Sequence, residues 1–68
     1  MSKAKESARE GVLNVLRANA GEVLEGDLIR IVSDQTGAEE DTVKDALEDL
    51  EHEMAIFRSS VDGMVELA

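Results

Sequence analysis

Apolar residues recur with a helical period through residues 38–54, and this stretch determines the fold we expect. Positions three, four, seven and eleven apart lie on one side of an α-helix, which turns once in about 3.6 residues. The apolar residues at this spacing are Val43, Ala46, Leu47, Leu50 and Met54. The same geometry gathers Asp41, Asp45, Glu48 and His52 on the opposite side. We therefore predict a helix with one face in a core and an acidic face outside it.

Two further helical patterns precede this one. Residues 7–20 carry Ala8, Val12, Val15, Leu16 and Asn19 on one face. Ser7 and Glu10 have the spacing of a capping box, which predicts that the first helix begins at Ser7. Residues 27–36 place Leu28, Ile31, Val32 and Gln35 inward, and Gly37 ends that helix. Only residues 37–38 separate it from the next helix, a tight turn typical of a helix-turn-helix.

Strand-like segments complete the pattern. Val23 and Leu24 form a short candidate strand between the first two helices. Residues 55–58 and 64–67 are strand-like and flank a turn that contains Asp62 and Gly63, which predicts a β-hairpin. We predict an α+β domain over residues 7–68, with three helices and a small C-terminal hairpin. Residues 1–6 carry no apolar stripe, so we predict a flexible basic arm there.

Composition narrows the class of protein. The chain has 68 residues and neither cysteine nor proline, so one small domain without disulfides is expected. No apolar run reaches the roughly 20 residues of a membrane span, and no signal-peptide core follows the start. These features predict a soluble, cytoplasmic protein that does not associate with membranes.

Charge is the strongest compositional signal. The chain contains sixteen acidic and seven basic residues, so its net charge is −9, and Phe57 is the single aromatic residue. Self-repulsion at this charge loosens a small fold, but at about 1 M salt the Debye length falls to ~3 Å. Because the acids are spread along nearly the whole chain, the surface resembles that of proteins from salt-loving organisms. The alternative is an acidic domain from a mesophilic organism, in which case the domain has a basic partner.

The order of elements resembles the winged helix-turn-helix family of DNA-binding domains. The resemblance runs from Ser7 to Leu67, and its pattern is Leu28, Ile31, Gly37, Val43, Leu47 and Leu50 followed by the hairpin. In that family the second helix of the pair enters the DNA major groove and the hairpin, or wing, contacts the backbone or minor groove. The resemblance implies a small transcriptional regulator that binds double-stranded DNA without a cofactor. The implied DNA-contacting residues are Thr42, Lys44, Arg58 and Ser59, with Lys3, Lys5 and Arg9 on phosphates.

The chain departs from that family where DNA would bind. Residues 39–53 contain eight acids and a single base, Lys44, whereas many relatives carry arginine or lysine there. Met54 also stands where many relatives have glycine. Because DNA affinity comes largely from cations on phosphates, these acids oppose binding at ordinary salt. The alternative is an acidic protein-interaction module of the same fold that binds a basic protein partner and not DNA.

Other chemistry has little support in the sequence. His52, with Asp45 and Glu48 nearby on the predicted helix, is the only candidate for a metal or catalytic cluster. Side chains on the exposed face of a helix do not converge to surround an ion, and no glycine-rich phosphate loop is present. We therefore expect neither an enzyme nor a metal site. Four apolar residues remain outside the main stripes: Leu13, Ile29, Ile56 and Phe57. We expect them to cover the helix interface, with homodimerisation as the alternative.

Overall fold

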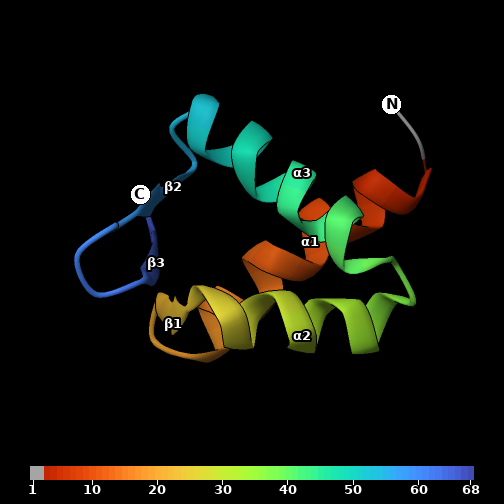
Figure 1. Ribbon diagram of the computed structural model, residues 1–68, viewed down its shortest axis with the longest axis horizontal. Helices are drawn as coiled ribbons and strands as arrows, with labels where there is room; N and C mark the ends of the chain where they lie inside the picture. The colour runs from red at the N-terminus through yellow and green to blue at the C-terminus, as the bar shows by residue number, and fades with distance from the viewer. Residues whose placement is uncertain (1–2) are drawn as a thin grey trace.

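The computed structural model describes residues 3–68, which form three helices and a three-stranded antiparallel sheet (Figure 1). In chain order the elements are α1 (Lys3–Ala18), β1 (Glu22–Leu24), α2 (Glu25–Thr36), α3 (Glu40–His52), β2 (Ile56–Arg58) and β3 (Met64–Leu67). The predicted α+β class and the predicted order of elements are confirmed.

The three helices enclose the core with their apolar faces. Helix α1 packs against both α2 and α3, and the predicted stripe of α3 from Val43 to Leu50 is buried. At Gly11 of α1 a Cβ atom would lie 3.0 Å from Cγ1 of Val32 and 3.1 Å from Cγ2 of Thr36, both in α2. Glycine at this position therefore allows the two helices to pack tightly.

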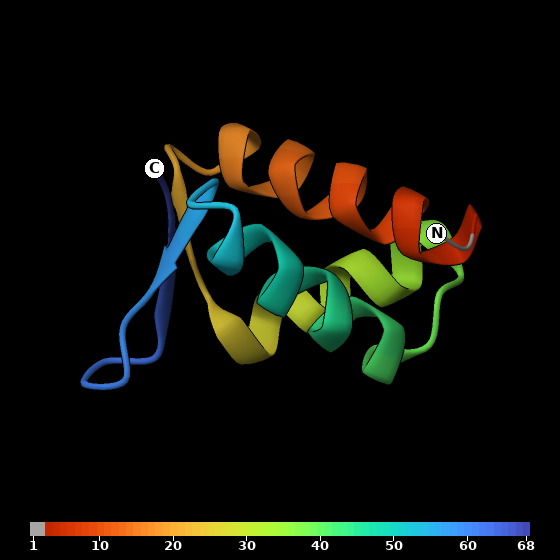
Figure 2. The same ribbon diagram turned by 90° about the horizontal axis from the view of Figure 1, so that it is seen from above.

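The sheet lies at one end of the helical bundle (Figure 2). Its strand order is β1-β3-β2, so β3 pairs with both neighbours. Ile56 and Val65 are fully buried and Val23 packs against the core. Side chains alternate along a strand, so Glu22, Leu24, Phe57, Met64 and Glu66 point away from the helices. One face of the sheet thus closes the core and the other lies outside it.

The turn of the hairpin is held by local hydrogen bonds. The amide of Ser59 donates to the carbonyl of Met64 at 2.9 Å, and the amide of Met64 donates to the Asp62 carboxylate at 3.0 Å. This second bond lowers the pKa of Asp62, because it favours the ionised carboxylate. Gly63 has a φ of +72°, which explains the glycine that the sequence places there.

Helix α1 begins earlier than predicted. It starts at Lys3, so residues 3–6 of the predicted arm are helical and Ser7 lies within the helix rather than at its cap. Lys5 and Arg9 bind carboxylates near the end of α3, which holds the polar start of α1 against the fold. Residues 1–2 of the predicted arm lie outside the described residues.

Two predicted core faces need correction. In α2, Ile29 is buried, Ile31 is half-buried and Gln35 is exposed, so the inward face is rotated relative to the predicted one. Met54 was expected on the buried stripe of α3 but is 76% exposed, because α3 ends at His52 and the chain turns away towards β2.

The residues outside the main stripes have different environments. Ile29 and Ile56 are buried and Leu13 packs against the core, as expected of residues that cover the helix interface. Phe57 differs from them, because it is 57% exposed on the outer face of the sheet.

Candidate functional site

Of the two helices α2 and α3, α3 has the more strongly charged outer face. Its exposed residues are Glu40, Asp41, Lys44, Asp45, Glu48, Glu51 and His52. Five of these seven are acids, and Lys44 lies 4.0 Å from the Asp41 carboxylate. Along the middle of this face run Asp41, Asp45 and Glu48, which we call the acidic ridge. The predicted acidic face of this helix is confirmed.

Two cations from α1 bind one edge of α3. The ammonium of Lys5 lies 2.6 Å from Oδ2 of Asp49, and Arg9 donates from Nη1 and Nη2 to the two Glu53 oxygens at 2.8 and 2.7 Å. The hydrogen bond from Lys5 lowers the pKa of Asp49, and those from Arg9 lower the pKa of Glu53. Asp49 and Glu53 are four residues apart and lie on the same side of the helix. Lys5 and Arg9 therefore neutralise two carboxylates near the C-terminal end of α3.

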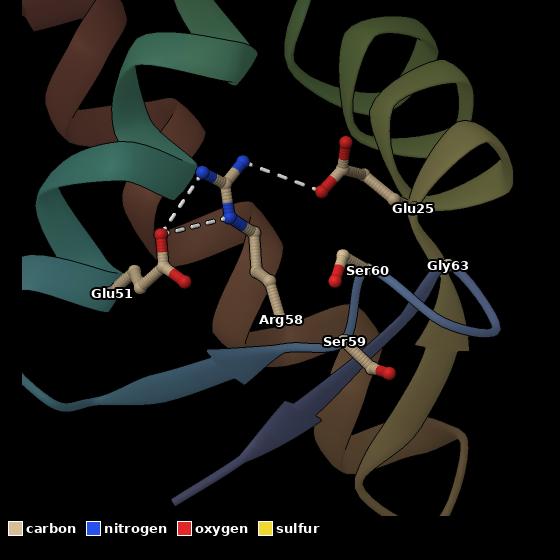
Figure 3. A pocket seen from close by; sticks show the side chains of 6 residues that line it. All are labelled: Glu25, Glu51, Arg58, Ser59, Ser60 and Gly63. Atoms are coloured by element: carbon tan, nitrogen blue, oxygen red, sulfur yellow. Dashed lines mark hydrogen bonds and ion pairs between the residues drawn. The ribbon is translucent and has the colours of Figure 1, made fainter.

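Arg58 binds the opposite edge of α3 (Figure 3). Its Nη2 lies 2.9 Å from Oε1 of Glu51, its Nε donates to the same oxygen at 3.1 Å, and its Nη1 reaches Glu25 at 3.3 Å. Burial alone lowers the pKa of Arg58, but the hydrogen bond and charge of Glu51 and the charge of Glu25 outweigh it and raise the pKa. The guanidinium thus connects β2, α3 and the start of α2.

A surface hollow lies beside this cluster. It has a volume of about 390 Å³ and is lined by Glu25, Glu51, Arg58, Ser59, Ser60 and Gly63 (Figure 3). Its one cation already contacts two carboxylates, so the hollow offers no positive charge for an anion. Its hydroxyl groups come from the turn between β2 and β3.

The seven residues proposed to contact DNA do not form one cationic surface. Lys5, Arg9 and Arg58 are all bound to carboxylates. Lys5 and Arg9 lie at one edge of α3, and Arg58 lies at the opposite edge. Lys3 is exposed on α1, Lys44 is exposed on α3 and Thr42 is half-buried there. Ser59 is exposed at the turn and accepts a hydrogen bond at Oγ from the amide of Val61.

Sequence reasoning missed the acidic partners of these cations. Asp49, Glu51 and Glu53 are three of the eight acids in residues 39–53, and nothing in the sequence distinguishes them or Glu25 as partners of a cation. The pairs Arg9–Glu53 and Arg58–Glu25 span 44 and 33 residues of sequence. No local spacing signals contacts at such separations.

Catalytic and metal-binding groups do not converge in the part of the chain that the structure describes. Within residues 3–68 no group of three or more His, Cys, Asp and Glu residues is arranged to hold a metal ion. In the same range no polar or charged side chain is buried, and His52 is exposed. The arrangement that remains is an electrostatic one: a negative ridge flanked by ion-paired edges.

Comparisons of the chain with protein-family models, with curated proteins and with solved structures gave no match. Among residues 3–68, the helices are all too short or too polar to cross a membrane.

Proposed function

We propose that this protein is an interaction module that binds a basic segment of a protein partner through the acidic ridge of α3. The observation that carries the proposal is the chemistry of the exposed face of this helix, where five of seven residues are acids. Such a face attracts cations over a distance and accelerates association with a positive partner. The proposal includes a winged helix-turn-helix origin for the fold and a role other than catalysis.

The ion pairs at the two edges of α3 argue against DNA as the partner. A duplex carries one negative charge for about every 1.7 Å of its axis, and affinity rises with the number of phosphates that Lys and Arg neutralise. Lys5, Arg9 and Arg58 would have to leave Asp49, Glu53 and Glu51 to reach phosphates. Because Arg58 would also leave Glu25, their departure would leave four further uncompensated carboxylates beside the DNA.

A charge-reversal experiment tests the proposal. The probe is a fluorescent oligolysine peptide, and its affinity is measured by anisotropy in dilute and in molar KCl. We expect binding to the wild type that weakens with salt, and a loss of tenfold or more in D45K/E48K. The matched control is E10K/D34K, which makes the same charge change at exposed positions of α1 and α2 and retains most of the affinity. Equal losses in both double variants would reduce the effect to net charge and overturn the proposal.

The second candidate is sequence-specific DNA binding by a small transcriptional regulator adapted to high salt. The tight connection between α2 and α3, together with the hairpin beside α3, is the observation that favours it. In concentrated potassium salt the repulsion is screened, and Thr42, Lys44 and Ser59 lie on the elements that would face the groove. Labelled duplex DNA in the same anisotropy assay distinguishes the two, because binding of DNA but not of oligolysine in molar KCl supports this candidate.

A further inference from the structure

The outer face of the sheet carries apolar side chains that no part of residues 3–68 covers. Leu24 is 48% exposed and Phe57 is 57% exposed, and Met64 points to the same side. Figure 2 shows the helices on the other side of the sheet, so this side is at the end of the molecule. We call these three residues, with Glu22 and Glu66, the outer sheet face.

The strand register places a carboxylate at the centre of this face. Glu66 of the middle strand pairs with Phe57 on one side and with Glu22 on the other, and Met64 pairs with Leu24. Residues directly opposite each other in antiparallel strands have their Cβ atoms about 5 Å apart, so Glu66 lies next to Phe57 on one side and next to a second carboxylate, Glu22, on the other. No ion pair among residues 3–68 includes Glu22 or Glu66.

This arrangement determines what can cover the face. Any occupant that removes Phe57 and Leu24 from water also removes Glu66, and an unpaired carboxylate is costly to bury. A second copy of the chain, packed face to face, would bury Glu22 and Glu66 of both copies without supplying a cation, in a protein of net charge −9. A partner with a cation between apolar groups would bury the apolar surface and neutralise Glu66.

We infer that the outer sheet face is a docking site for an amphipathic basic segment of a partner protein, with lysine or arginine opposite Glu66 and apolar side chains against Phe57, Met64 and Leu24. This site is separate from the acidic ridge of α3, and the inference holds whether or not the ridge binds its own partner.

The test uses three synthetic peptides: an amphipathic helix of leucine and lysine, the same helix with glutamate in place of lysine, and oligolysine. We expect the leucine–lysine peptide to bind and to shift the amide resonances of residues 22–24, 57 and 64–66. The leucine–glutamate peptide should not bind. Oligolysine should leave these resonances unchanged, since it brings no apolar groups.

Variants locate the binding. F57S and E66K should each lower the affinity for the leucine–lysine peptide tenfold or more. Their matched controls are V61S, which removes an apolar side chain that is 95% exposed in the hairpin turn, and D34K, which makes the same charge change at an exposed position of α2, outside both proposed binding surfaces. Both controls should stay within twofold of the wild type. Far-ultraviolet circular dichroism checks that each variant is folded.

Four outcomes would overturn the inference. The first is a leucine–lysine peptide that does not bind, and the second is an equal loss in E66K and D34K, which would mean attraction to net charge. The third is self-association of the wild type that F57S abolishes, because a second copy would then be the occupant. The fourth is a loss in D45K but not in E66K, which would place the binding on the acidic ridge and leave the proposed function standing without this site.

Discussion

At the scale of single residues, Met54 and Ala20 are the two non-glycine residues with positive φ in the part of the chain that the structure describes, at +63° and +61°. Met54 follows the cap residue of α3, where a left-handed residue commonly ends a helix. A side chain costs about 1–2 kcal/mol in this conformation, and glycine avoids that cost. The exposed side chain of Met54 contributes little burial in return.

We therefore expect Met54→Gly to stabilise the protein. Release of the left-handed strain outweighs the greater chain entropy of glycine in the unfolded state, and the net gain is about 0.5–1 kcal/mol. The free energy of unfolding in urea measures it. Met54→Ala is the control, because alanine keeps the Cβ atom and the strain. A glycine variant less stable than the alanine variant would contradict the argument.

At the scale of elements, the pairing of α1 with α3 depends on charge as well as on the core. Arg9 binds Glu53 with two hydrogen bonds, and Lys5 binds Asp49. Both carboxylates have a pKa lowered by these partners. A carboxylate whose pKa is lower in the folded state stabilises the fold above its unfolded pKa, and this contribution is lost as pH falls through the folded value.

Comparison of the wild type with Glu53→Gln isolates this effect from the titration of the other acids. We expect the wild type to be the more stable of the two at pH 7. The difference should begin to shrink below pH 4.5, the ordinary pKa of a glutamate, and should disappear once Glu53 is protonated in the folded protein. Urea unfolding at a series of pH values measures it. A difference that grows in acid would refute the assignment.

At the scale of the whole molecule, a net charge of −9 is carried by a body with extents of 29 × 22 × 18 Å. At about 0.1 M salt the Debye length of ~10 Å lets most of these charges interact, and at about 1 M it falls to ~3 Å. Salt also weakens the exposed ion pairs, which individually contribute little. Repulsion among the excess acids is therefore the larger of the two effects.

We expect the melting temperature to rise when KCl increases from about 0.1 to about 2 M. For a domain of this size, a gain of about 1 kcal/mol raises Tm by roughly 4–8 °C. In E10K/D34K each substitution removes one negative charge and adds one positive charge, so the net charge is less negative by four and the rise should be smaller. A melting temperature that falls with salt would show that the ion pairs dominate, and would count against adaptation to high salt.

Much of the fold was predictable because it depends on local periodicity. The spacing of Val43, Ala46, Leu47 and Leu50 marks the buried side of α3, and the acids between them mark its outer side. Asp62 and Gly63 mark the hairpin turn through local backbone chemistry. The start of α1 was not predictable in the same way, because residues 3–6 have no apolar stripe. The contact that holds them is between Lys5 and Asp49 of α3, which is distant in sequence.

The sequence by itself determined the α+β class, the order of elements and the acidic character of α3, since each follows from residue type and from spacing within a few turns of chain. Tertiary structure alone decided which cations meet which carboxylates and which apolar residues stay outside. Arg58 contacts Glu51 and Glu25 only because β2, α3 and α2 meet at one corner of the fold. Phe57 and Glu66 become neighbours only through the register of β2 against β3, and pairing between strands is a relation that no single segment contains.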